Sequence, residues 1–269
     1  MITSLHSPHV EAVKALLGSR GVKARRESHT YVVESLQNIR ELIDNAPLQI
    51  KTLYATADGL EKLGPVSSVD VQIDIQIDIQ EVSPEVMKAM TDTVTPQGLL
   101  AIAKIPNNSL DEFFAVKKNG IKLAYFWEIQ DPGNAGTVIR AADAFGFDGV
   151  LFSDKSVDVY SPKVVRSSAG SHWHIPIFED VTIEALLDSA RNNSFELYAT
   201  DADANLDLLA AAQESSSSSA IWIFGNEARG IPNQLQAKRV AIPINGKAES
   251  LNLATAASVV MYAVSAARK

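Results

Sequence analysis

Short apolar stretches and helix-period segments alternate in the first 110 residues of the chain. The pattern predicts a strand over residues 31–34, a helix over 36–44, a strand over 50–55, a short helix over 83–90, and a turn leading into a strand over 95–103. Residues 69–79 alternate strictly between Val or Ile and Asp or Gln, which predicts a strand with one buried and one wet face. These elements together predict a small α/β sandwich.

Strands and helices alternate more regularly from residue 121 onward. The predicted segments are 123–129, 137–145, 150–153, 162–169, 175–178, 183–191, 196–200, 220–224, 234–238 and 240–244. This order is typical of a mostly parallel sheet with helices on both faces. We therefore predict a first domain over residues 1–106, a linker that is helical in part over 107–120, and a second domain over 121–269. The five serines at 215–219 are interpreted as a solvated turn without chemistry.

Residues 240–264 read as a buried strand, a polar loop and a buried helix. Ser250 and Asn252 stand where a helix N-cap is expected, and Arg268 and Lys269 carry charge that suits the C-terminal end of a helix dipole. The helix could serve only to pack the end of the chain. However, the polar residues 249–252 follow a core strand, where open α/β sheets bind ligands.

Composition and charge narrow the class of protein. The chain has 269 residues, 46% of them hydrophobic, no cysteine and a net charge of -8. No apolar run reaches the roughly 18 residues of a membrane span, and we expect a cytoplasmic protein without a membrane partner. The negative charge argues against broad nonspecific binding of nucleic acid. A basic cluster nevertheless lies near the N-terminus, either as a solvated helix face or as a phosphate-contacting edge, and comprises Lys14, Arg20, Lys23, Arg25 and Arg26.

Two further loops of the second domain carry candidate chemistry. Gly133 and Gly136 permit close backbone approach beside a helix N-terminus, which is a natural seat for an anion. Arg140 is expected in the first turn of that helix, where a cation opposes the dipole and indicates a phosphate or carboxylate partner. The other loop, residues 223–232, has glycines at phosphate-loop spacing but Ile-Pro in place of the lysine and hydroxyl residue, so it does not predict nucleoside triphosphate binding.

Other chemistries find little support in the sequence. No closely spaced glycine fingerprint is present, which disfavours ordinary dehydrogenases and the usual glycine-loop methyltransferases. His172 and His174 flank Trp173 at strand spacing and would share a face, but no cysteine or third ligand accompanies them. We therefore expect no metal site.

Four segments follow one another in the second domain: Asp131–Arg140, Phe224–Gly230, Ile242–Ile244 and Glu249–Leu253, with a further segment at Val165–Gly170. In this order they resemble the motifs of the SpoU (TrmH) family of RNA 2′-O-ribose methyltransferases. The first domain resembles the L30e-like substrate-binding domain of many members, most clearly at Thr95–Leu99. It departs from the family at Glu34-Ser35, where Glu-Gly is frequent, and in the repeated Ile-Asp-Ile-Gln strand.

The resemblance implies a fold, a cofactor and a set of site residues. It implies a C-terminal trefoil knot, S-adenosylmethionine as cofactor, a homodimer and an RNA substrate. It assigns to the reaction site Asn134, Arg140, Glu227, Ser250 and Asn252, with Arg140 reaching across the dimer. It assigns to cofactor binding Thr200, Gly225, Ile242, Ile244 and Leu251, and we add as RNA-contacting candidates Arg25, Arg26, Lys163 and Arg166.

The expected reaction is attack of a ribose 2′-hydroxyl on the activated methyl group. Arginine stays protonated in proteins, so Arg140 is expected to grip a substrate phosphate and stabilise the developing alkoxide, while Asn134 and Ser250 orient the hydroxyl. Ribosomal RNA is the expected substrate at the level of the family, and transfer RNA is the alternative. A noncatalytic RNA-binding protein of the same fold and an enzyme acting on a small molecule remain open at this point.

Overall fold

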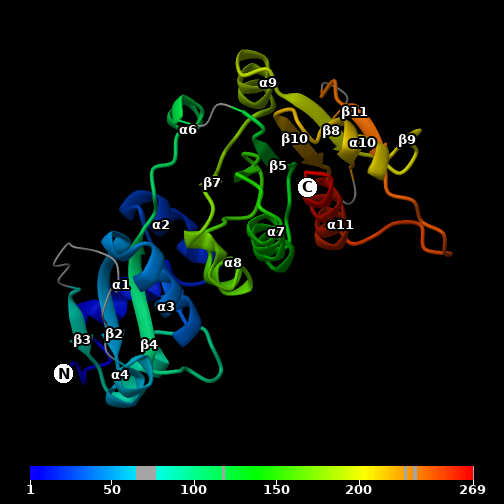
Figure 1. Ribbon diagram of the computed structural model, residues 1–269. Helices are drawn as coiled ribbons and strands as arrows, with labels where there is room; N and C mark the ends of the chain where they lie inside the picture. The colour runs from blue at the N-terminus through cyan, green and yellow to red at the C-terminus, as the bar shows by residue number, and fades with distance from the viewer. Residues whose placement is uncertain (65–76, 117–118, 227–228, 233–234, 269) are drawn as a thin grey trace. The chain divides into compact units, whose positions relative to one another are not determined.

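The computed structural model describes residues 1–64, 77–116, 119–226, 229–232 and 235–268. These residues form two compact units. Unit 1 comprises Met1–Asn107 and Asp158–His174, and unit 2 comprises Asn108–Val157 and Ile175–Lys269 (Figure 1). The stretch 158–174, here called the inserted segment, therefore belongs to unit 1 although the chain on either side of it belongs to unit 2.

Unit 1 contains a four-stranded mixed sheet with helices around it. Its strands are β1 (Thr30–Glu34), β2 (Ile50–Ala55), β3 (Ile79–Glu81) and β4 (Leu99–Lys104), in the order β1-β4-β2-β3. Its helices are α1 (Pro8–Leu16), α2 (Val22–Ser28), α3 (Leu36–Asn45), α4 (Ala57–Leu63), α5 (Pro84–Ala89) and α8 (Pro162–Ser167), with 3-10 turns at Ser19–Gly21, Pro47–Gln49 and Ser171–Trp173. β4 pairs antiparallel with β1 and β2, whereas β3 pairs parallel with β2.

The core of this unit forms because alternate strand residues point to opposite faces of the sheet. Val32 of β1 and Tyr54 of β2 pack with Val10 of α1 and Val86 of α5 on one face. α3 contacts β1 and β4 and buries its own apolar stripe, so the predicted α/β sandwich is present. Of the predicted strand over residues 69–79, positions 69–76 lie outside the described residues, and β3 begins only at Ile79.

The inserted segment is held to the sheet of unit 1 by polar and aromatic contacts. Asp158 pairs with Arg25, with Nε donating to Oδ2 at 2.7 Å and Nη2 at 2.6 Å from the same oxygen. Arg166 Nη1 lies 2.6 Å from Oε2 of Glu34. Trp173 Nε1 donates to the hydroxyl of Tyr31 at 3.0 Å. Three side chains of α2 and β1, which are distant in sequence from the segment, thus fix it.

His172 and His174 do not lie on a strand, contrary to the expectation from their spacing. They flank Trp173 in and after the 3-10 turn Ser171–Trp173. The His172 ring is buried, its Nε2 lies 2.8 Å from the carbonyl oxygen of Val159, and burial lowers its pKa to about 4. No group of three or more metal-ligating side chains occurs among the residues that the structure describes.

Unit 2 is built on a seven-stranded sheet whose strands, among the described residues, all pair in parallel. Its strands are β5 (Lys122–Phe126), β6 (Gly149–Phe152), β7 (Ile177–Phe178), β8 (Glu196–Thr200), β9 (Leu206–Asp207), β10 (Ala220–Phe224) and β11 (Lys238–Ala241), in the order β7-β6-β5-β10-β8-β11-β9. Its helices are α6 (Leu110–Val116), α7 (Pro132–Ala144), α9 (Ile183–Asn192), α10 (Leu208–Glu214) and α11 (Leu253–Ala267).

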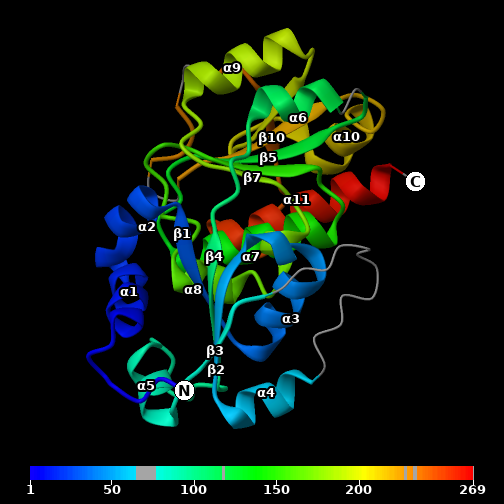
Figure 2. The same cartoon turned by 90° about the vertical axis from the view of Figure 1, so that its left-hand side faces the viewer.

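Helices cover both faces of this sheet, as the alternating pattern predicted. α6 and α9 lie on one side of β5 and β10, and α7 and α11 lie on the other (Figure 2). Phe113 and Phe114 of α6, in the stretch predicted as a linker, pack against Phe178 and Phe195 in the core of unit 2. Within the described ranges, no helix is long and apolar enough to span a membrane.

The serine run at 215–219 has a structural role that its composition did not indicate. Ser215 is buried, and the ammonium of the buried Lys122 donates to its carbonyl oxygen at 2.5 Å and also to that of Ser218. Burial lowers the pKa of Lys122 to about 8. The turn therefore supplies the carbonyl groups that compensate a buried cation, rather than being only solvated.

Candidate functional site

A cavity of about 410 Å³ opens in unit 2 at the carboxyl ends of β8, β10 and β11. Thr200 is the last residue of β8, Gly225 follows β10, and Ile242 follows β11. Because parallel strands end at the same edge of a sheet, three segments far apart in sequence meet here. The cavity is lined by Thr200, Asp201, Ala202, Gly225, Asn226, Gly230, Val240, Ile242, Ile244, Glu249, Ser250, Leu251, Asn252, Leu253 and Ala256.

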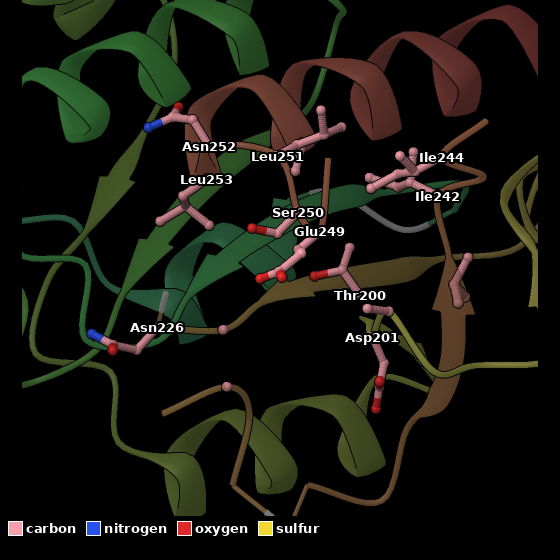
Figure 3. Close-up of a pocket in the computed structure, with 15 residues that line it drawn as sticks. Thr200, Asp201, Asn226, Ile242, Ile244, Glu249, Ser250, Leu251, Asn252 and Leu253 are labelled. Carbon is pink, nitrogen blue, oxygen red and sulfur yellow. The ribbon is translucent and has the colours of Figure 1, made fainter. Parts of the chain in front are cut away.

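The five residues predicted to bind a cofactor all line this cavity. The side chains of Ile242 and Ile244 lie together on one side of it, and Thr200 and Glu249 direct oxygen atoms toward its centre (Figure 3). The Thr200 hydroxyl donates to the carbonyl oxygen of Ile223 at 3.4 Å. The site therefore combines an apolar wall with a polar one.

Backbone hydrogen bonds close the loop after β10. Asn226 N donates to Gly230 O at 3.1 Å, and Gly230 N donates back to Asn226 O at 2.8 Å. A Cβ atom at Gly225 would lie 2.7 Å from the carbonyl carbon of Gly230, closer than real Cβ contacts allow. The loop can close only because residue 225 is a glycine. Glu227, predicted as a reaction-site residue, lies outside the described residues.

The start of α11 joins the cavity to the start of α7. Asn252 is the N-cap of α11, since its Oδ1 accepts from the backbone N–H groups of Ala254 at 2.9 Å and Thr255 at 3.2 Å. Its Nδ2 donates to Oδ1 of Asn134 at 3.2 Å. Asp131 caps α7 by accepting from Asn134 N at 2.8 Å. Two of the predicted reaction-site residues are thus in direct contact beside the cavity, and a third, Ser250, lines it.

The two helices run in the same direction. At their other ends, Arg268 donates to the carbonyl oxygen of Gly146 at 3.0 Å, just after α7 has finished. Both N-terminal ends, which carry partial positive charge, therefore lie on the side of the cavity. A negative or electron-rich group at this place would be stabilised by both helices.

Arg140 does not lie in the first turn of its helix. α7 begins at Pro132, so Arg140 is in the middle of the helix and its position does not oppose the dipole. The dipole argument for an anionic partner is therefore wrong. Arg140 is exposed and is not among the residues that line the cavity.

The predicted RNA-contacting residues occupy unlike environments in unit 1. Arg25 is 1% exposed and bound to Asp158, so its guanidinium is not available to a phosphate. Arg166 is half-buried and paired with Glu34, whereas Arg26 and Lys163 are exposed. A phosphate-contacting edge can therefore include Arg26 and Lys163 but not Arg25.

Sequence reasoning gave no role to Asp201, and it treated Glu249 only as part of a polar corner. Both residues line the cavity, and the Asp201 carboxylate lies 3.8 Å from Nη1 of Arg239. Asp201 comes directly after β8, and its N–H donates to Val240 O at 2.9 Å across the strand ends. The rule that ligands bind beyond the carboxyl ends of parallel strands would have identified it, had it been applied to every strand.

Family comparisons assign both parts of the chain. The SpoU rRNA Methylase family matches residues 123–262, and the MRM3-like substrate binding domain matches residues 8–101. The chain is 29% identical over 244 residues to the 23S rRNA (guanosine(2553)-2′-O)-methyltransferase of Bacillus subtilis (strain 168), spanning 89% of this chain and 90% of that protein. It is 30% identical over 175 residues to the 23S rRNA (uridine(2479)-2′-O)-methyltransferase of Streptomyces viridochromogenes, spanning 62% and 59%.

Solved structures agree over nearly the whole length. The SpoU methyltransferase AviRb from Streptomyces viridochromogenes, in complex with the cofactor AdoMet, superposes with a TM-score of 0.82 at 26% identity, covering 98% of each chain. The AdoMet-bound rRNA methyltransferase from Sinorhizobium meliloti superposes with a TM-score of 0.81 at 27% identity, covering 98% of this chain and 96% of that one.

Proposed function

The chain belongs to the SpoU rRNA methylase family, and from this premise we propose that it transfers a methyl group from S-adenosylmethionine to a ribose 2′-hydroxyl of ribosomal RNA. The observation that carries the proposal is the cavity at the ends of β8, β10 and β11, next to the contact between Asn252 and Asn134. The relatives named as ribosomal RNA methyltransferases support ribosomal over transfer RNA.

The chemistry of the cavity suits S-adenosylmethionine. Ile242, Ile244 and Leu251 offer an apolar surface for a flat heterocycle, and the backbone around Gly225 permits close approach. Glu249 directs its carboxylate into the cavity, where a ligand with ammonium and sulfonium groups gains from opposite charge (Figure 3). The cofactor supplies a methyl group already activated by the positive sulfur. The protein must therefore align the groups and help the hydroxyl proton leave.

We propose roles for the reaction-site residues that the family resemblance named, and their chemistry and positions support these roles. Asn134 and Ser250 orient the ribose hydroxyl, and Asn252 holds the amide of Asn134 through their hydrogen bond. The partial positive charge of the α7 and α11 N-termini stabilises the developing alkoxide. Arg140 binds a substrate phosphate, since arginine remains protonated and cannot act as an ordinary base. The role of Glu227 stays a prediction.

Arg140 is exposed at the middle of α7, so it can serve a site on a second subunit. α11, which packs beside α7, exposes 63% of Tyr262 together with Val259, and burial of both in an interface would remove apolar surface from water. We therefore propose a homodimer that uses this surface.

Arg26, Lys163 and Arg166 of unit 1 form the RNA-contacting edge. The protein acts in the cytoplasm.

Methyl transfer from labelled S-adenosylmethionine to total RNA tests the function. Ribosomal and transfer RNA are separated after the reaction and digested to nucleosides. Label on a 2′-O-methyl nucleoside from ribosomal RNA is expected. Label only in transfer RNA would contradict the substrate, and label on a base would contradict the reaction. Absence of cofactor binding would instead favour a noncatalytic RNA-binding protein.

A further inference from the structure

Unit 1 contains a polar cavity of about 180 Å³ where β1 ends and β4 begins. No site described above uses it. Its polar lining consists of Glu34, Ser35, Thr91, Thr93, Thr95 and Gln97. A cavity of this size holds the equivalent of about six water molecules, at roughly 30 Å³ of liquid volume each.

The carboxylate of Glu34 is the charged group of this cavity. Glu34 is 3% exposed, yet it lines the cavity. Its Oε1 accepts from the Thr91 hydroxyl at 2.5 Å and from Asp92 N at 3.1 Å, and Oε2 pairs with Arg166. A carboxylate offers about four acceptor positions, so capacity for about one further donor remains.

Gln97 supplies the complementary donor. Its Oε1 accepts from the backbone N–H of Leu36 at 2.8 Å, which leaves the NH2 group as the part of the amide that can bind a ligand. Pro96 and Leu99 add apolar lining. The cavity thus offers an acceptor, a donor and an apolar surface within a small volume.

A nucleobase has this combination of features, because its faces are apolar and its edge carries donors and acceptors. A phosphate is disfavoured, since the charge of Glu34 is already paired with Arg166 and the residues that line the cavity include no lysine or arginine to bind a further anion. Proteins read RNA sequence mainly at unpaired bases whose edges are accessible. We propose that this cavity binds one unpaired base of the RNA substrate, and that Glu34 selects a base with an exocyclic amino group. The inference rests on the proposed function and deepens it.

Cytosine and uracil are suitable ligands for testing this selectivity, because they differ in the group that would face Glu34. The 4-amino group of cytosine donates to Glu34, and its neighbouring ring nitrogen accepts from the Gln97 NH2 group. Uracil presents a carbonyl at the same position and would face the carboxylate with an acceptor. Cytosine is therefore expected to bind and uracil to be rejected.

Two leucine variants of the whole 269-residue chain test the cavity through RNA affinity. Thr95 lines the cavity, whereas the adjacent Val94 is 94% exposed and does not. Thr95→Leu fills the cavity and is expected to weaken binding of an unmodified 23S rRNA transcript by about tenfold, which corresponds to about 1.4 kcal/mol. Val94→Leu should leave this affinity within about twofold of wild type, and both variants should bind S-adenosylmethionine as wild type does.

Calorimetric titration with nucleosides tests the selection itself. Cytidine should bind wild-type protein about tenfold more tightly than uridine, and Thr95→Leu should remove the difference. Equal binding of the two nucleosides, or wild-type RNA affinity in Thr95→Leu, would overturn the proposal while the wild-type protein still methylates RNA. Failure of the wild-type protein to methylate any RNA would instead contradict the proposed function.

Discussion

At the scale of single residues, Ser35 holds a backbone conformation that is suited to glycine. Its φ is 82° and its ψ is 147°, a region that costs an L-residue about 1–3 kcal/mol. Its hydroxyl also caps α3 by accepting from Asn38 N at 3.3 Å. Glycine would adopt this conformation without strain, so the serine that stands in place of the family's frequent glycine has an energetic cost.

Ser35→Gly is therefore expected to raise the free energy of unfolding by about 1 kcal/mol. Relief of the strained φ outweighs loss of the serine cap, which costs only a few tenths of a kcal/mol when glycine replaces it. Urea denaturation measures the change. Ser83→Gly is the matched control, because Ser83 caps α5 with the same 3.3 Å bond but at an ordinary φ of -70°. The control should be slightly destabilised, and equal behaviour of the two variants would contradict the assignment of strain.

His172 is expected to make stability depend on pH. Its folded pKa of about 4 lies below the value of about 6.5 in an unfolded chain, so the unfolded state binds the proton first as the pH falls. The contribution of His172 to the free energy of unfolding is complete above about pH 6.5 and falls by about 3 kcal/mol as the pH approaches 4. Unfolding free energies between pH 4 and 7 should show a smaller slope in His172→Gln than in wild type. An equal slope in the two proteins would contradict the assignment of this pH dependence to His172.

Arg140→Lys tests the proposed phosphate grip. Lysine keeps the charge but loses the planar guanidinium that binds two phosphate oxygens at once. We expect kcat/KM for RNA methylation to fall by about tenfold or more, which corresponds to about 1.4 kcal/mol. The affinity for S-adenosylmethionine should not change. Arg191→Lys, at an exposed position of α9, is the control, and full turnover in Arg140→Lys would rule out the two-pronged contact.

At the scale of elements, α7 and α11 run side by side in the same direction, and Asn252 joins their starts. The residue has two separable roles, since Oδ1 caps α11 and Nδ2 donates to Asn134. An aspartate at 252 would keep the cap but replace the donor with a charged acceptor. Alanine would remove both interactions.

Asn252→Ala is therefore expected to lower the free energy of unfolding by about 1 kcal/mol, and Asn252→Asp to leave it nearly unchanged. Both variants should lose methyl transfer, because Asn134 is no longer held. Denaturation and transfer assays on the two proteins separate the roles. If Asn252→Asp were as active as wild type, the bond to Asn134 would not serve the reaction.

Several elements could be predicted from the sequence because the local pattern of apolar and polar residues determines where they begin and end. β8 and β10 have the predicted bounds, since each is a short apolar run between polar turns. The five residues that line the cavity could be named because nearby segments resemble motifs of the family, and their role in cofactor binding stays a prediction. α10 was not predicted, and the burial of Ser215 around Lys122 depends on contacts 93 residues apart that no local pattern records.

At the scale of the whole molecule, the buried pair of Arg25 and Asp158 joins residues 133 positions apart. The sequence placed Arg25 in a basic surface cluster, because charge patterning cannot reveal a partner so distant. Arg25 is enclosed, and its guanidinium also bonds to the carbonyl oxygens of Leu16 and Gly18. Loss of its carboxylate would leave a buried charge without a counterion.

Asp158→Ala is expected to lower the free energy of unfolding by about 3 kcal/mol, because breaking a buried ion pair from one side is strongly destabilising. Urea denaturation measures this loss. Asp188→Ala removes a carboxylate from an exposed pair with Arg191 and should cost less than about 0.5 kcal/mol. A similarly small loss at Asp158 would mean that water reaches Arg25.

The inserted segment also limits where the sequences of two related proteins can be joined to form a working chimera. The family match at 123–262 runs through residues 158–174, yet these residues complete the core of the other unit. A chimera that joins residues 1–107 of one relative to the remainder of another would mismatch the partners of Arg25, Glu34 and Tyr31. Recombination at a single crossover is therefore disfavoured, and a functional graft must carry two pieces of sequence together.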